Sequence, residues 1–279
     1  MKKVLFTAVA VVLALTGCKQ APAEERMADL DAQWAEFEDV YKTRMESIQK
    51  DETMNDEQKQ VEAESFYDSF TEECAKYTEK AVRKNKGDEV SLAALKKGIF
   101  FLSDDQVEEL AAILTPENQQ DERIARNLAV IAARKATKEG TMFVDFEIVE
   151  DPENAPEKVT KFSDFVGNGK YVLVDFWASW CGPCKAEIPN IKAVYEKYAG
   201  DDFDVLSIAV WDKPEATKAA AEEHGVVWNQ IINAQKIPTD IYGINGIPHI
   251  ILVGPDGTIV KRDLRGEGIE AAVVEALGR

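Results

Sequence analysis

The sequence contains few of the residues that build metal sites, with four cysteines and two histidines among its 279 residues. Cys181 and Cys184 form its one Cys-x-x-Cys pair, and no second such pair or Cys/His pair accompanies it. A structural zinc site needs four such ligands, so this pair does not complete one. We therefore expect no metal and no bound cofactor, and any chemistry of the pair must come from its own two thiols.

Basic stretches are also missing. The chain carries 51 Asp and Glu against 33 Lys and Arg, a formal net charge of −18. Proteins that bind nucleic acid neutralise phosphates with clustered Lys and Arg, so this balance argues against a nucleic-acid partner. The composition, 45% hydrophobic and 30% charged, is otherwise that of an ordinary globular protein, and the length suffices for two domains.

The apolar segment at the N-terminus is too short to cross a membrane as a helix. Val4 to Leu15 follows Lys2 and Lys3, and this order is typical of a signal peptide. The tetrapeptide Leu15-Thr16-Gly17-Cys18 resembles the bacterial lipobox, in which the cysteine is lipidated and becomes the new N-terminus. The alternative is an ordinary secretory signal followed by a chance cysteine.

The lipobox interpretation makes residues 1–17 a lipoprotein signal peptide and residues 18–25 a lipidated cysteine with a short tether. More than one acyl chain anchors a protein stably, so we expect Cys18 to hold the mature protein on a membrane outside the cytoplasm, facing the periplasm. Lys19 rather than aspartate follows the cysteine. By resemblance to lipoprotein sorting rules, this favours the outer membrane.

Residues 26–140 predict an all-α domain of four or five antiparallel helices. The segment is rich in Ala, Glu, Lys and Gln and contains one proline, Pro116, which suits the first turn of the last helix. Ser103 with Gln106 predicts a capping box. Apolar residues recur at three- and four-residue spacings, which indicates helices that bury one stripe: Trp34, Phe37, Val40, Tyr41, Met45 and Ile48 in the first, and Phe66, Phe70, Cys74 and Tyr77 in the second.

The helical domain resembles no family that we recognise, and it contains no evident chemistry. Cys74 lies on an apolar stripe, so we interpret it as a buried thiol that packs as a small hydrophobe rather than as a third redox cysteine. Three roles stay open for the domain: substrate recognition, dimerisation, or a spacer from the membrane.

The most informative stretch is Tyr171 to Lys185, YVLVDFWASWCGPCK. Tyr171 to Trp177 is an apolar run of strand length, and the Cys-x-x-Cys leads directly into a helical pattern that begins near Ala186. Pro183 suits the first helical turn because the N–H that it lacks has no intrahelical partner there. A strand that delivers two thiols to a helix N-terminus is typical of a redox site.

The helix N-terminus favours a thiolate at the first cysteine of the pair. Free cysteine titrates near 8.5, and the partial positive charge of a helix N-terminus can lower this pKa toward roughly 7. Such a shift corresponds to about 2 kcal/mol of stabilisation of the anion. We therefore expect Cys181 to be the nucleophile and Cys184, one helical turn later, to be the resolving thiol.

The segment VDFWASWCGPC closely resembles the active site of the thioredoxin family, and the pattern from Thr141 to the C-terminus is similar to that of the membrane-anchored thioredoxins of the TlpA and ResA type. The resemblance covers half of the chain. It implies an α/β thioredoxin fold over residues 141–279, with a central mixed sheet flanked by helices. The expected helix Pro214 to Glu223 and strand Val226 to Ile232 resemble the helix–strand insert of the TlpA and ResA group.

Other elements of this half follow from local patterns. Strands are expected at Phe143 to Val149 and Phe203 to Trp211, and a hairpin at Ile250 to Lys261. Helices are expected at Ala186 to Tyr198 and Gly268 to Leu277.

Asp175 is the first candidate supporting residue. Strand alternation puts Leu173, Asp175 and Trp177 on one face, and burial of a carboxyl there raises its pKa into the range where it can accept and return a proton at neutral pH. The thioredoxin family carries a buried aspartate at the matching place, which acts on the resolving cysteine, here Cys184. The alternative is an edge aspartate bonded to the backbone.

Pro248 is the second candidate supporting residue. In thioredoxins the place of Gly246-Ile247-Pro248 holds a cis proline beside the active-site pair, and the resemblance implies that the Ile247 backbone pairs with an extended substrate strand. The alternative is a trans proline at the start of a strand. Trp177 and Trp180 flank the motif, and we expect one of them to pack beneath it and the other to be partly exposed as a docking surface. The residues expected to contact substrate are Trp180, Gly182, Pro183, Ile247 and Pro248.

The sequence gives weaker support for a role of either histidine in the redox site. His249 departs from the family, where threonine is common at this place, and it could stabilise a thiolate. Strand alternation instead favours a side chain turned away from the cysteines. His224, before Gly225, is interpreted as part of a helix C-terminus.

The leading hypothesis is an enzyme, a protein thiol-disulfide oxidoreductase that reduces disulfides in extracytoplasmic proteins through a mixed disulfide. The Gly-Pro dipeptide matches the reducing branch of the family, where thioredoxin lies about 150 mV below the oxidant DsbA, or about 7 kcal/mol for two electrons. An oxidising compartment then implies a membrane electron donor of the DsbD or CcdA type. The alternatives are a disulfide oxidase or isomerase, and a redox-switched adaptor that binds partners through its helical domain. Peroxide reduction is disfavoured because an adjacent Cys-x-x-Cys is not the peroxiredoxin arrangement.

Overall fold

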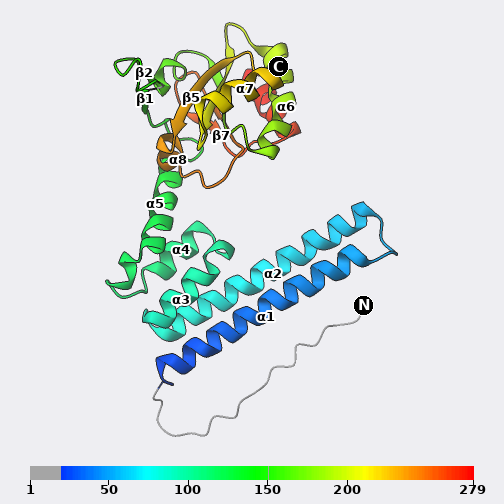
Figure 1. Ribbon diagram of the computed structural model, residues 1–279, viewed down its shortest axis with the longest axis vertical. Coiled ribbons are helices and arrows are strands. Elements are labelled where there is room, and N and C mark those ends of the chain that lie inside the picture. Colours follow the sequence, from blue (N-terminus) through cyan, green and yellow to red (C-terminus); the bar gives the residue numbers. More distant parts are fainter. Residues whose placement is uncertain (1–19, 150) are drawn as a thin grey trace. The chain divides into compact units, whose positions relative to one another are not determined.

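The computed structural model describes residues 20–149 and 151–279 (Figure 1). The predicted signal peptide and the predicted lipidation site at Cys18 lie outside the described residues. The chain divides into two compact units, which meet between Ile124 and Ala125. Within the described ranges, no helix has the length and apolar character needed to cross a membrane.

The first unit is built on a long helical hairpin. Helices α1 (Ala23–Lys50) and α2 (Asp56–Asn85) run antiparallel, and α3 (Glu89–Gly98) packs against both of them (Figure 1). The 3-10 turn η1 (Ile99–Phe101), helix α4 (Asp104–Ala111) and the 3-10 turn η2 (Asn118–Gln120) follow. The predicted capping box is present, since the Gln106 N–H donates to the Ser103 hydroxyl and the Ser103 N–H donates to the Gln106 side chain.

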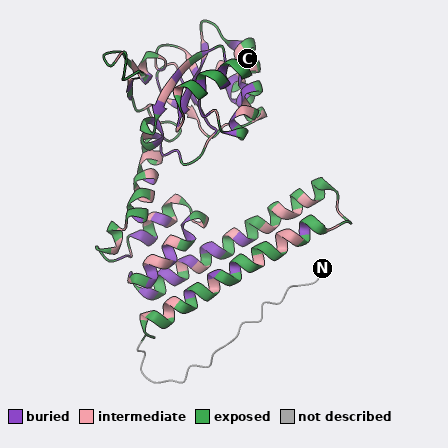
Figure 2. Ribbon diagram, viewed as in Figure 1, coloured by how far each residue is buried: buried purple, intermediate pink, exposed green. Residues whose placement is uncertain are grey.

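The apolar stripe of α1 is only partly covered. Trp34, Phe37 and Ile48 are buried as predicted, whereas Val40 and Met45 are half-buried and Tyr41 is 36% exposed. Burial is densest where α3 lies over the hairpin, and the opposite end of the hairpin is largely exposed (Figure 2). The hairpin is therefore longer than the helices that cover it.

The last helix of this region, α5 (Glu122–Ala136), begins later than predicted. Pro116 does not open it, because the Asp121 carboxylate accepts hydrogen bonds from the Arg123 and Ile124 N–H groups and caps the helix there. The division between the units falls inside α5, whereas the predicted boundary at residue 140 lies after this helix.

The C-terminal end of α5 is bound tightly to the second unit. The Arg262 guanidinium donates to the Thr137 carbonyl and, at 2.8 Å, to the Tyr242 carbonyl. Gly243 lies so close to α5 that an added Cβ would come within 2.5 Å of the Val130 carbonyl oxygen, and its φ of +63° favours glycine independently. These contacts make α5 part of the structure of the second unit.

A five-stranded mixed sheet of order β5-β4-β3-β6-β7 forms the centre of the second unit. Strand β3 (Tyr171–Trp177) pairs parallel with β4 (Phe203–Val210), which pairs parallel with β5 (Asn229–Gln235). On its other side β3 pairs antiparallel with β6 (His249–Val253), and β6 with β7 (Ile259–Lys261). The central mixed sheet flanked by helices that the sequence predicts is therefore confirmed.

Each face of the sheet has its own apolar core. Helices α6 (Gly182–Tyr198), α7 (Pro214–His224) and α9 (Glu267–Leu277) cover the face of Leu173 and Trp177. The opposite face, which carries Val172, Val174 and Phe176, packs against β1 (Glu147–Val149), the 3-10 turn η3 (Phe162–Asp164) and α8 (Ile237–Tyr242). Strand β2 (Val159–Lys161) pairs with β1 in a separate small sheet.

Two predicted strands differ from the structure, and one helix was not predicted. Only Glu147 to Val149 of the predicted strand Phe143 to Val149 is a strand. Strand β5 begins three residues later than predicted, because Gly225 in the left-handed conformation ends α7 and the next three residues form a connection. Helix α8 was not predicted; it opens with Pro238 in its first turn and is too short for an apolar repeat to identify.

Removing α5 should destabilise the second unit. A fragment that starts at Glu122 keeps the α5 contacts, whereas one that starts at Thr141 leaves the partly buried Arg262 without its Thr137 acceptor. We expect the shorter fragment to lose at least about 2 kcal/mol of unfolding free energy. Urea unfolding followed by tryptophan fluorescence measures this difference, and equal stabilities of the two fragments would contradict the assignment of α5 to this unit.

Candidate active site

The two cysteines lie where the central strand meets its helix. Strand β3 ends at Trp177, and Cys181 is the N-cap of α6, with Pro183 in the first turn. The two sulfurs form a disulfide bond, and the cysteines are 4% and 1% exposed. The Cys184 backbone N–H donates to the Cys181 sulfur at 3.1 Å. A helix N-terminal N–H directed at this sulfur favours negative charge on it once the bond is reduced.

Asp175 is buried on the same face of β3 as Trp177. The side chain is 1% exposed, and burial raises the pKa of its carboxyl to about 7, against opposing contributions from a Ser207 hydrogen bond and the Arg265 charge. The Ser207 hydroxyl donates to one carboxyl oxygen at 3.4 Å, while the other oxygen has no hydrogen-bond partner among the described residues. A carboxyl with these properties can hold or release a proton near neutral pH.

The loop before β6 approaches Cys181. The Ile247–Pro248 peptide bond is cis, as the resemblance implied, and the Ile247 carbonyl oxygen lies 3.6 Å from the Cys181 sulfur. The Pro248 carbonyl accepts a hydrogen bond from the Arg265 guanidinium. The loop is thus held from one side by Arg265 while its backbone borders the disulfide.

Glu187 and Arg265 belong to this site, and sequence reasoning missed both. Glu187 is one helical turn after Cys184 on α6, and its carboxylate accepts the Gly266 N–H at 3.1 and 3.2 Å. Its negative charge raises the pKa of Asp175, and the positive charge of Arg265 lowers it. The spacing of Glu187 from Cys184 was visible in the sequence, but nothing local indicates that Arg265 reaches Pro248.

The tryptophans that flank the motif behave as predicted. Trp177 is 1% exposed beneath the cysteines, and Trp180 is 60% exposed. The Trp180 indole N–H donates to the Trp211 carbonyl at 3.0 Å, and the Ser179 N–H donates to the Asp212 carboxylate at 2.6 Å. The segment between β3 and α6 is therefore tied to the end of β4, with one aromatic ring left open to solvent.

His249 and Cys74 lie apart from the redox pair. His249 is opposite Phe176 on β6, so it faces the core on the other side of the sheet, as strand alternation predicted. Its Nδ1 lies 2.7 Å from Asp263 and its Nε2 lies 3.1 Å from an Arg262 nitrogen. Cys74 is fully buried, as predicted, and burial raises the pKa of its thiol to about 11, which disfavours the reactive thiolate. His224 is the last residue of α7 before Gly225.

No metal-binding cluster accompanies these residues. In residues 20–149 and 151–279, no three or more His, Cys, Asp or Glu side chains gather in a way that could hold a metal ion. The chemistry that the geometry supports is thiol-disulfide exchange at Cys181 and Cys184, with Asp175 available for the proton.

Comparisons with known proteins agree with this chemistry. Residues 139–262 match the AhpC/TSA family model. The thiol-disulfide oxidoreductase ResA of Bacillus subtilis is 27% identical over 133 residues, which cover 48% of this chain and 71% of that protein. ResA of Halalkalibacterium halodurans is 28% identical over 131 residues, covering 47% and 70%. The family model does not extend into the helical unit.

Two solved structures are also similar to part of this chain. The thioredoxin domain of a thiol-disulfide oxidoreductase from Bacteroides vulgatus is 30% identical, and the match covers 50% of this chain and 96% of that one with a TM-score of 0.43. A thiol:disulfide interchange protein from Bacteroides sp. is 30% identical, covering 52% and 93% with a TM-score of 0.44.

The buried carboxyl makes stability depend on pH. Because the pKa of Asp175 is raised from 3.8 to about 7, the folded protein retains a proton that the unfolded chain releases, and stability falls as pH rises through this window. Asp175→Asn removes the effect. We expect the unfolding free energy of this variant, taken relative to that of the parent protein, to rise by about 3 kcal/mol between pH 4.5 and pH 8 in the oxidised state.

Urea unfolding at the two pH values measures this gain. The matched control is Asp201→Asn, which removes an exposed carboxylate from the same unit and should show no such change. A pH-independent difference between Asp175→Asn and the parent would contradict the raised pKa.

Proposed function

We propose that this chain, whose C-terminal unit is a thioredoxin-like thiol-disulfide oxidoreductase domain homologous to the ResA proteins, reduces disulfide bonds in proteins outside the cytoplasm. The observation that carries the proposal is the position of Cys181 at the N-terminus of α6, with the Cys184 N–H donating to its sulfur. This geometry supports attack by Cys181 on a substrate disulfide.

The proposed reaction has two exchange steps. The Cys181 thiolate attacks one sulfur of the substrate disulfide, so that a mixed disulfide forms and the other substrate sulfur leaves as a thiolate that takes up a proton. Asp175 then accepts the Cys184 proton, and the Cys184 thiolate attacks the Cys181 sulfur. The bond between Cys181 and the substrate breaks as the internal disulfide forms, and the second substrate sulfur leaves as a thiolate that takes up a proton. The substrate gains two electrons and the enzyme loses two.

The surroundings of the pair support these roles. The exposed Trp180 and the Ile247 backbone border the disulfide, and with Gly182, Pro183 and Pro248 they are the proposed contacts of an extended substrate segment. No cofactor beyond the dithiol is proposed. The disulfide must be reduced again after each cycle, for which we propose a membrane dithiol donor of the DsbD or CcdA type.

Trapping the mixed disulfide tests the assignment of the two cysteines. Cys184→Ser lacks the resolving thiol, so it should accumulate a covalent adduct with a disulfide substrate such as insulin through Cys181. The adduct is detected on a non-reducing gel and by mass spectrometry. Cys181→Ser is the control and should form no adduct; trapping through Cys184 instead would reverse the two roles.

The reduction potential decides the direction of electron flow. We expect a value near that of thioredoxin, about −270 mV, because the Gly-Pro dipeptide separates the cysteines. Titration against dithiothreitol or glutathione buffers, with thiol alkylation as readout, gives the value. A potential near about −120 mV, that of the oxidant DsbA, would favour the oxidase or isomerase function instead.

The location of the protein is proposed from the sequence alone. The lipobox-like tetrapeptide ending in Cys18 supports a lipid-anchored protein of the cell envelope that faces the periplasm, with the outer membrane favoured. We expect Cys18→Ala to move the protein from the detergent-rich phase to the aqueous phase in detergent partitioning. Mass spectrometry of the mature N-terminus should find the parent protein acylated at Cys18, and a free cysteine there would refute the anchor.

A further inference from the structure

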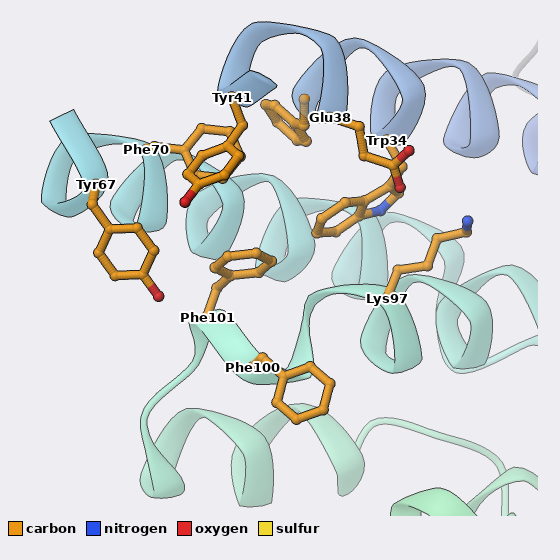
Figure 3. Close-up of a pocket in the computed structure, with 9 residues that line it drawn as sticks. Trp34, Glu38, Tyr41, Tyr67, Phe70, Lys97, Phe100 and Phe101 are labelled. Atoms are coloured by element: carbon orange, nitrogen blue, oxygen red, sulfur yellow. The ribbon is translucent and has the colours of Figure 1, made fainter. Parts of the chain in front are cut away.

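The helical unit contains an open aromatic pocket that the proposed chemistry does not use. Its cavity is about 480 Å³ and lies between α1, α2 and the segment that includes the end of α3 and η1 (Figure 3). Seven of its nine lining residues are aromatic, and the other two are Glu38 and Lys97. This volume is within the range of sites that hold a ligand of a few residues' size.

The pocket has a packed floor and open walls. The rings of Trp34, Phe37 and Phe70 are buried and contact one another or Phe101 at centroid distances of 5.5 to 6.1 Å. Tyr67 and Phe100 are 50% and 79% exposed. A soluble protein that leaves such rings open around a cavity exposes an apolar surface of the kind that marks a binding site.

One charged group in the pocket wall is left without a partner. Lys97 forms an ion pair with Asp31 at 3.1 Å, whereas no hydrogen bond or ion pair to the Glu38 carboxylate is present in the described part of the chain. The Trp34 indole N–H also has no acceptor among the described residues, but its nitrogen is buried beneath the surface of the pocket and is out of reach of an occupant. The pocket therefore offers one carboxylate.

The acidity of the unit favours a cationic occupant over an anionic one. Residues 20–124 contain 27 Asp and Glu against 13 Lys and Arg. Aromatic faces bind guanidinium and ammonium groups, and the pocket wall already does so within the chain, since the Arg123 guanidinium carbon lies 5.2 Å from the Phe100 ring centre. In Figure 3 the charged ends of Glu38 and Lys97 stand at one end of the group of rings and Tyr67 at the other.

We propose that this aromatic pocket binds an extended polypeptide segment in which arginine is flanked by aromatic side chains, as the recognition site for substrates of the reductase; in naming the occupant a substrate, the inference rests on the proposed function. The flanking rings pack on the aromatic walls, and the guanidinium pairs with Glu38. The exposed rings and the unpaired carboxylate of the pocket are then each matched by a group of the segment.

Fluorescence anisotropy with the purified protein tests the binding. The probe is a fluorescein-labelled peptide, Gly-Ser-Phe-Arg-Phe-Ser-Gly, and the matched peptide has citrulline, a neutral isostere, in place of arginine. We expect the citrulline peptide to bind about fivefold more weakly at low salt, with the difference shrinking in high salt. Equal binding of the two peptides, or binding of neither, overturns the proposal.

Variants locate the site. Glu38→Gln should weaken binding of the arginine peptide about fivefold and leave binding of the citrulline peptide unchanged. Asp39→Asn removes the same charge from the neighbouring exposed residue and should change the affinity for neither peptide. Phe100→Ser and Tyr67→Ser each remove one exposed aromatic ring from the pocket wall and should weaken peptide binding about tenfold. The control is Val61→Ser, which changes a 61% exposed residue of α2 outside the pocket. Wild-type affinity in both wall variants overturns the assignment of the site.

Reduction of glutathione disulfide, which carries neither arginine nor an aromatic ring, separates this proposal from the proposed function. The pocket variants should keep this activity, since it does not require the pocket, whereas Cys181→Ser should lose it and keep peptide binding. Sedimentation velocity tests the competing occupant, a second copy of the chain. A dimer of the parent protein that Phe100→Ser abolishes would show that the pocket is a self-association surface and refute the peptide proposal.

Discussion

The interaction on which the redox site depends is the hydrogen bond from the Cys184 N–H to the Cys181 sulfur. It exists because β3 ends four residues before Cys181 and α6 starts immediately after it, so that the first free N–H groups of the helix meet the sulfur. The ties of Ser179 and Trp180 to the end of β4 hold the connecting segment in place. The sheet thus fixes the position of Cys181, and the N-terminus of α6 stabilises the negative charge of its thiolate in the reduced state.

The same strand also supplies the proton group. Asp175 lies on β3 between the apolar Leu173 and Trp177, on the face covered by α6. Its burial opposes ionisation, and the nearby charges of Arg265 and Glu187 act on it in opposite directions. The pKa near 7 is therefore a property of the packing around the strand rather than of any single contact.

Sequence reasoning succeeded where a function is encoded in one short segment. The strand, both cysteines and the buried face of Asp175 could all be predicted from Tyr171 to Lys185, because period-two alternation and the first-turn proline are local signals. The role of Pro248 came from a family resemblance. Arg265 and the docking of α5 through Arg262 could not be predicted, since these contacts join residues far apart in the chain. The aromatic pocket was missed because in the sequence its rings look like the buried stripe of an ordinary amphipathic helix. The sequence does not show that the helices packed on the α1–α2 hairpin are too short to cover all of these rings.

The acidity of the helical unit has a kinetic consequence. An excess of carboxylates over basic groups in residues 20–124 extends an attractive potential for cationic chains to about one Debye length, about 8 Å at physiological ionic strength. The association rate of a polypeptide with this unit therefore depends on the charge of the polypeptide, and acidic polypeptides associate more slowly than basic ones. The ionic strength of the surrounding fluid then sets how selective that first encounter is.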